Sequence, residues 1–82
     1  MANNRTTEAQ LVDLFIMRTN IARRTDFLVL RNDLEKMEGF HWCTIDLEDC
    51  DKVLRVECEN ASIDKIVERV AAHGFLCQEL ED

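Results

Sequence analysis

Four cysteines and two histidines are the most reactive side chains of this 82-residue sequence. The cysteines lie at positions 43, 50, 58 and 77, so no pair has Cys-x-x-Cys spacing. Cys43 and Cys58 fall on inward positions of predicted strands, and Cys77 is expected to do so as well. Because a free cysteine packs well as a small apolar side chain, we interpret these three as core residues.

Cys50 differs from the other cysteines, because it lies in a predicted hairpin turn and should be exposed. His73 lies at the end of a predicted helix, near the same end of the fold as the hairpin turn. Asp26 lies at the start of the other predicted helix. Cys50, His73 and Asp26 could therefore form a makeshift site for a copper or zinc ion. Ligands on turns are not preorganised for a metal, and His73 is also favourable simply as a cation at a helix C-terminus. The main expectation is no cofactor, with this site as the alternative.

The sequence contains no recognisable set of catalytic residues. It has no Ser/His/Asp order and no glycine-rich phosphate loop. His41 and Cys43 stand two apart on a predicted strand and should share one face. A nucleophilic thiol needs an accessible setting that favours the thiolate, and the strand pattern buries Cys43 instead. We predict that the protein is not an enzyme.

Acidic residues dominate the second half of the chain, and residues 39–82 account for the whole net charge of −7. Nucleic-acid binding needs a basic footprint, and only Arg23 and Arg24 stand side by side, so we expect no nucleic-acid partner. Beside a helix N-terminus, the two arginines could bind an anion or an acidic partner. The simpler reading is local pairing with the acidic hairpin residues Glu48, Asp49 and Asp51.

Length and hydropathy indicate one soluble domain over residues 11–82, after a disordered polar tail at residues 1–10. No apolar run reaches the roughly 18 residues that span a bilayer, and the N-terminus has no apolar signal core. We therefore expect no membrane partner, a cytoplasmic location and reduced thiols.

Two helices and four strands follow from the spacing of apolar residues. A helix is predicted from an N-cap at Thr25 or Asp26 to a left-handed glycine, Gly39. A second helix begins after Ser62 and stops at Gly74. Strands are predicted over residues 11–17, 43–47, 54–58 and 75–80, and the middle two form a hairpin through an acidic turn at residues 48–52.

This order predicts an α+β, ferredoxin-like βαββαβ sandwich. The sheet should be four-stranded and antiparallel, with strand order 4-1-3-2 and both helices on one face. In this topology the connections at residues 20–25, 48–52 and 73–75 lie at one end of the sheet. We expect functional residues there, since loops at the end of a rigid scaffold commonly bind ligands.

The run Met17-Arg18-Thr19-Asn20-Ile21, the first helix, the stretch from Gly39 to Leu47 and the stretch from Asp51 to Val56 resemble a heavy-metal-associated domain, the fold of copper chaperones. The resemblance implies a Cys-x-x-Cys motif after the first strand that holds a soft ion such as Cu(I). Counted back from Gly39, these positions are Arg23 and Asp26. An arginine cannot ligate a cation and a carboxylate is a hard donor, so the implied metal site is degenerate.

Trp42 should point to the open face of the sheet if Cys43 points inward. In the similar proteins the tryptophan stands one position later and faces inward, which a local bulge could reproduce here. An exposed tryptophan on an uncovered sheet can anchor a partner or a second copy. The sequence thus predicts an interaction module that uses Arg23, Arg24, Trp42 and the acidic hairpin. We expect its partner to be an unidentified protein and the chain itself to be a monomer or a weak homodimer. A further alternative is a structural role, as a homodimer formed through an open sheet edge or as a partner subunit.

Overall fold

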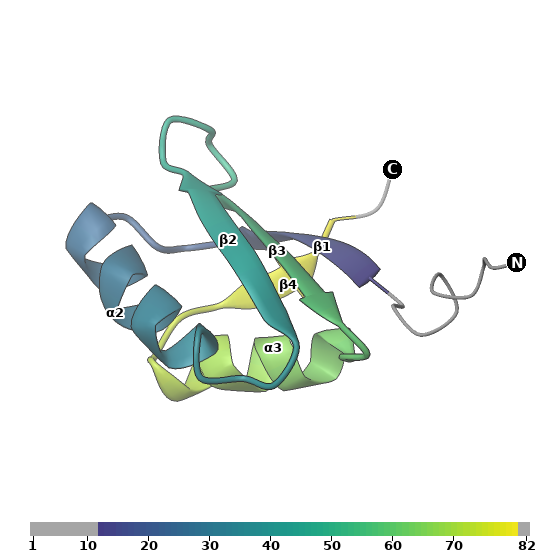
Figure 1. Cartoon of the computed structure of the whole chain (residues 1–82). Coiled ribbons are helices and arrows are strands. Elements are labelled where there is room, and N and C mark those ends of the chain that lie inside the picture. Colours follow the sequence, from purple (N-terminus) through teal and green to yellow (C-terminus); the bar gives the residue numbers. More distant parts are fainter. Residues whose placement is uncertain (1–11, 81–82) are drawn as a thin grey trace, which may run out of the picture.

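A computed structural model describes residues 12–80, so the predicted tail at residues 1–10 lies outside the described part of the chain. The elements follow in the order β1 (Val12–Thr19), α2 (Arg24–Leu34), β2 (Phe40–Asp46), β3 (Val53–Glu59), α3 (Ile63–Ala72) and β4 (Cys77–Glu79). All strand pairs are antiparallel in the order β2-β3-β1-β4, which confirms the predicted sheet. Figure 1 shows α2 and α3 on the same side of it, as the ferredoxin-like arrangement requires.

One hydrophobic cluster joins the two helices to the covered face of the sheet. Alternate residues of β3 point into it, while those between them face the other way. The fully buried side chains are those of Met17, Ile21, Leu30, Leu34, Leu54, Val56, Cys58, Ile66 and Val70. Within residues 12–80, no helix is long and apolar enough to cross a membrane.

Helix α2 begins and ends earlier than the sequence predicted. Its N-cap is Arg23, with extended φ and ψ of −124° and 141° and no side-chain capping hydrogen bond. Thr25 and Asp26 lie inside the first turn, so the predicted N-cap was wrong by two or three positions. The helix ends at Leu34, where a tighter turn begins with a 3.0 Å hydrogen bond from the Met37 N–H to the Leu34 carbonyl.

Two glycines adopt the left-handed conformation, which the sequence predicted for Gly39. Gly39 has φ +85°, but it lies at the entry to β2 rather than at the end of α2. A Cβ there would stand 2.5 Å from the Glu59 carbonyl oxygen. Gly74 has φ +88° and ends α3 as predicted, with the Phe75 N–H donating to the Val70 carbonyl in a Schellman motif.

A β-bulge interrupts the pairing of β2 with β3 between Phe40 and Trp42. His41 and Trp42 therefore stand opposite the single residue Glu57, and both side chains lie on the open face. Cys43 is buried on the covered face. The expectation that His41 and Cys43 share a face was wrong, because the bulge breaks the two-residue alternation. Trp42 faces outward with 40% of its surface exposed, so the bulge does not turn it inward.

Candidate functional site

The three connections that the sequence placed at one end of the sheet do meet there. The Thr19 N–H donates to the Asp51 carbonyl over 2.9 Å, and the Thr19 hydroxyl donates to the Lys52 carbonyl over 2.7 Å. On the other side, the Asn20 side-chain oxygen accepts a 2.8 Å hydrogen bond from the Leu76 N–H. Thr19 and Asn20 thus tie the β1–α2 loop to both the β2–β3 hairpin and the α3–β4 turn. We call this region the loop end.

Arg23, Arg24 and Asp26 lie where α2 starts, beside the loop end. Both arginines are exposed, and Asp26 is half-buried in the first helical turn. A carboxylate in that turn is favoured by the free N–H groups of the helix N-terminus. Neither arginine belongs to an ion pair within residues 12–80. The expected pairing with Glu48, Asp49 and Asp51 is therefore not formed.

The acidic hairpin holds its own shape through local hydrogen bonds. The Asp46 carboxylate accepts from the N–H groups of Glu48 and Asp49, at 3.1 and 3.3 Å. The Asp49 carboxylate accepts from the Asp51 N–H at 2.8 Å, and the Lys52 ammonium donates to the Leu47 carbonyl at 2.7 Å. These Asx-type bonds order the turn, so its shape does not depend on the two arginines.

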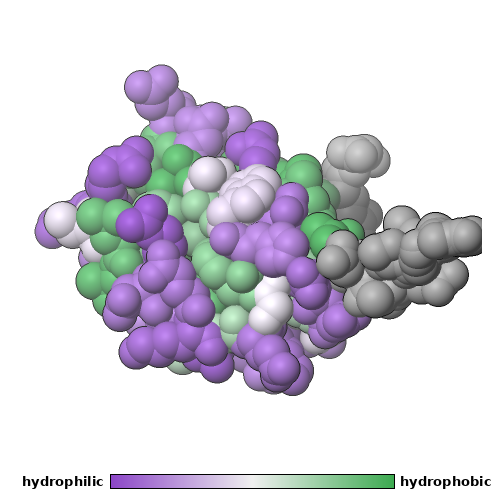
Figure 2. Space-filling model, viewed as in Figure 1, coloured by the Kyte–Doolittle hydropathy of each residue, from purple (hydrophilic) through white to green (hydrophobic). Residues whose placement is uncertain are grey.

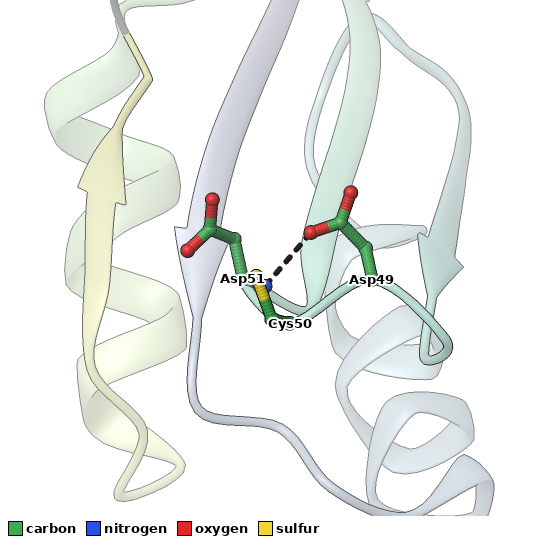
Figure 3. A group of neighbouring side chains, drawn as sticks. All are labelled: Asp49, Cys50 and Asp51. Carbon is green, nitrogen blue, oxygen red and sulfur yellow. Dashed lines mark hydrogen bonds between the residues drawn. The ribbon is translucent and has the colours of Figure 1, made fainter.

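Asp49, Cys50 and Asp51 form one group of potential metal ligands within the described residues, with their ligand atoms all within 4.8 Å of one another. Figure 3 shows the three side chains rising to the same side of the hairpin, with the thiol between the carboxylates. Cys50 is exposed, as the sequence predicted. One thiolate and two hard oxygens suit a borderline ion such as Zn(II) better than Cu(I).

His73 does not join this group. Its Nε2 lies 2.9 Å from an Asp33 carboxylate oxygen on α2, and the Arg69 guanidinium lies 2.6 Å from the other. These contacts hold the pKa of Asp33 below its ordinary value, chiefly through the His73 hydrogen bond. Cys50, His73 and Asp26 are therefore not brought within ligating distance of one another, because His73 is directed towards the packed helices.

The other cysteines are poor ligands and poor nucleophiles. Cys43 and Cys58 are buried, and Cys77 is half-buried with its thiol 3.4 Å from the Met17 sulfur. Burial raises the pKa of Cys43 and Cys77 to about 11 and also raises that of Cys58. Thiolates, the reactive forms, are thus suppressed at all three positions.

Sequence reasoning missed a charged cluster on the open face of the sheet. His41 Nε2 lies 2.7 Å from a Glu59 carboxylate oxygen, and its Nδ1 lies 3.0 Å from one of Glu57. Hydrogen bonds with Glu59 and then Glu57 raise the pKa of His41 above its ordinary value. The alternation of Glu57 and Glu59 along β3 was a visible signal, but the bulge that brings His41 to them was not.

Comparison with known proteins identifies the fold. No protein-family model matches the sequence, and no curated protein matches it. The copper transporter domain CCC2A of yeast is 22% identical with a TM-score of 0.72, over 84% of this chain and 96% of that one. The CsoZ metallochaperone is 16% identical with a TM-score of 0.71, over 87% and 100% of the two chains.

The HMA domain of a copper chaperone for superoxide dismutase, in its apo form, is also similar in structure. It is 11% identical, with a TM-score of 0.73 over 99% of this chain and 76% of that chain. Identities this low establish the fold alone. The chain has the fold of a heavy-metal-associated domain, as its sequence resemblance implied.

Proposed function

We propose that this chain is a non-enzymatic interaction module on a heavy-metal-associated fold that has lost the Cys-x-x-Cys metal site. The observation that carries the proposal is the residue content of the first loop. Arg23 and Asp26 stand where the resemblance places the two thiolates, and a guanidinium repels a cation. The two buried thiols, those of Cys43 and Cys58, belong to the hydrophobic core.

The loop end offers a surface of mixed charge to a partner protein. Arg23 and Arg24 are exposed and lie outside the ion pairs of residues 12–80. The self-ordered acidic hairpin projects nearby. Complementary charges on a partner would fix its orientation and speed its association. Trp42 is a second candidate anchor, and free thiols fit a reducing compartment such as the cytoplasm.

Two experiments test this proposal together. The reduced, isotope-labelled protein is titrated with Cu(I) and then Zn(II) without oxygen, while backbone amide shifts are recorded. We expect no saturable shifts around residues 20–26 with Cu(I). Saturation near one equivalent, centred on that loop, would overturn the proposal, because the loop would then still bind metal.

The second experiment compares partner capture by the wild type and by an Arg23→Glu, Arg24→Glu variant, with a photoreactive side chain in place of Ala22. We expect the double variant to lose the crosslinked partner. The matched control is Lys36→Glu, Lys65→Glu, which makes the same charge change away from the loop end and should keep the partner. Equal loss in both variants would show that net charge, not this surface, controls binding.

A second candidate function is supported by the grouping of Asp49, Cys50 and Asp51. In this reading the hairpin captures a borderline ion such as Zn(II). Three ligands on one turn bind weakly unless a fourth comes from a partner. Cys50→Ser separates the two functions, because it should abolish Zn(II)-induced shifts at residues 48–52 and leave partner capture unchanged.

A further inference from the structure

The open face of the sheet carries exposed apolar side chains that neither helix covers. Val12 and Leu14 of β1 are 44% and 50% exposed, and Trp42 of β2 is 40% exposed. Ile16 of β1 lies half-buried on the same face. Figure 2, drawn from the viewpoint of Figure 1, shows hydrophobic residues emerging among hydrophilic ones beside β1 as well as over α2. An uncovered sheet face with such residues is a natural docking surface.

Charges on this face are segregated along the strands. Arg55 stands opposite Ile16, while Glu57, the next outward residue of β3, stands opposite Leu14. Arg18 continues the basic end, and Glu59 continues the acidic end. At the acidic end, both glutamates contact His41. Neither Arg18 nor Arg55 belongs to an ion pair within residues 12–80. The basic end is therefore the one that lacks a counter-charge.

The register makes this face complementary to itself. Two neighbouring cross-strand rows are Thr44–Arg55–Ile16 and Trp42–Glu57–Leu14. Consider a two-fold axis between these two rows that is perpendicular to the strands and parallel to the plane of the sheet. Rotation about this axis would place each row of one copy opposite the other row of the second copy. Arg55 would then meet Glu57 of the second copy, and Ile16 would meet Leu14. Each contact would occur twice, as in every isologous interface.

We infer that a second copy of this chain packs on the open face, with the two sheets face to face and their β3 strands antiparallel. The sheets would lie about 10 Å apart, with Leu14, Ile16 and Trp42 between them. Because only a few apolar side chains would be buried between the sheets, we expect a weak dimer. It should form over roughly 10 µM to 1 mM, the range of modest association energies.

This inference extends the proposed interaction module by naming the partner of the Trp42 face. It rests on that proposal only in assigning an interaction role to Trp42. The loop-end proposal depends on Arg23 and Arg24 and can fail or stand by itself.

Trp42 supplies a direct signal, because it is the single tryptophan of the chain and the chain has no tyrosine. The full-length protein is examined by sedimentation equilibrium and by tryptophan emission from about 1 µM to 1 mM. We expect the mass to double and the emission to shift to shorter wavelength with the same midpoint. A protein that stays monomeric throughout, or that dimerises without an emission change, overturns the inference.

Charge reversal tests the register itself. The variant Arg55→Glu places a carboxylate against Glu57 of the second copy, and the variant Glu57→Arg places a guanidinium against Arg55 of the second copy. Each variant alone should therefore dimerise at least about tenfold more weakly. A mixture of the two variants should recover association, since every facing pair is then opposite in charge. Failure of the mixture to associate, with each variant folded by amide NMR, overturns the proposed pairing.

Controls for net charge come from the exposed surface of α3. Lys65→Glu and Glu68→Arg change the charge by the same amounts and should dimerise within about twofold of the wild type. If these variants weaken the dimer as much as the two β3 variants, general repulsion controls assembly and the open-face interface is wrong.

Discussion

At the scale of single residues, His41 is held by carboxylates on both ring nitrogens. A neutral imidazole has only one N–H donor, so two facing carboxylates are satisfied together only by the imidazolium. The two hydrogen bonds, first that of Glu59 and then that of Glu57, therefore raise the pKa of His41 above its ordinary value of 6.5. A bulged residue thus holds its proton more tightly than its strand position alone would predict.

The raised pKa of His41 predicts the sign of a pH effect on stability. Since the folded state holds the proton more tightly, the stabilisation by His41 is fully present below pH 6.5 and is lost as the pH rises through its folded pKa. The glutamates must also be ionised, so the His41 contacts stabilise the fold only above about pH 5. We expect the free energy of unfolding of the wild type, minus that of His41→Asn, to be greatest near about pH 6.

The titration of the His41 ring proton in NMR spectra measures the same pKa directly. The variant Glu57→Gln, Glu59→Gln should lower it towards 6.5, because the charged acceptors are gone. If both substitutions leave the pKa of His41 unchanged, the assigned contacts are wrong.

The cysteines predict a single reactive thiol. Burial raises the pKa of Cys43 and Cys77 to about 11, and Cys58 is fully buried, whereas Cys50 is exposed. A short treatment of the native protein with iodoacetamide should add one label, detected by intact mass. Cys50→Ser should remain unlabelled, and the unfolded wild type should take four. Two or more rapid labels on the native protein would show that the core cysteines open easily.

At the scale of elements, Asp33 joins the two helices through one carboxylate. Its oxygens accept from Arg69 of α3 and from His73, the C-cap of that helix, so the ends of α2 and α3 are fixed side by side. The lowered pKa of Asp33 means that this stabilisation is present above its ordinary pKa of 3.8 and is lost as the pH falls through its depressed value.

We expect Asp33→Asn to lower the free energy of unfolding by about 1 kcal/mol near neutral pH, as for other partly exposed charged contacts. Denaturant unfolding at pH 7 and at about pH 3 measures the effect, which should shrink at the lower pH. Glu68→Gln is the matched control, since Glu68 lies exposed on α3 outside the ion pairs of residues 12–80. An equal loss in both variants would mean that the Asp33 contacts contribute nothing specific.

The two left-handed glycines predict different costs for the same substitution. Gly74→Ala meets nothing within 4 Å and should cost about 1 kcal/mol, from the positive φ alone. Gly39→Ala adds a Cβ only 2.5 Å from the Glu59 carbonyl oxygen, which cannot move without disturbing β3. It should lower the free energy of unfolding, measured with denaturant, by roughly 2–4 kcal/mol, because the steric clash adds to the cost of the positive φ. Equal costs would show that the β2 entry can relax.

At the scale of the whole molecule, the helices, the strands and their order could be predicted from the sequence, because they depend on the periodicity of apolar residues. Met17, Leu30, Val56 and Val70 mark faces whose spacing identifies each element, and their order requires the observed sheet. Features set by contacts across the chain were missed. The sequence could not show that His73 would bind Asp33, because the two are 40 residues apart and meet only when the helices pack.

The candidate site was predictable to the same degree. Its location follows from topology, so the meeting of Thr19, Asn20 and the hairpin could be expected. The absence of the expected ion pairs could not be predicted, because the carboxylates of Asp46 and Asp49 accept from backbone N–H groups rather than from Arg23 or Arg24. Local hydrogen bonds compete with long-range charge pairs, and composition does not decide between them.

The bulge in β2 also bears on how the chain can change in length. His41 is the extra residue between Phe40, which packs against the core, and Trp42, which faces outward. Without His41, Phe40 and Trp42 would be neighbours in a regular strand and would keep their present faces. A one-residue deletion there should therefore leave the core intact, whereas the same deletion two positions later would invert the rest of β2. This strand contains one place at which a residue can be gained or lost without a shift of register.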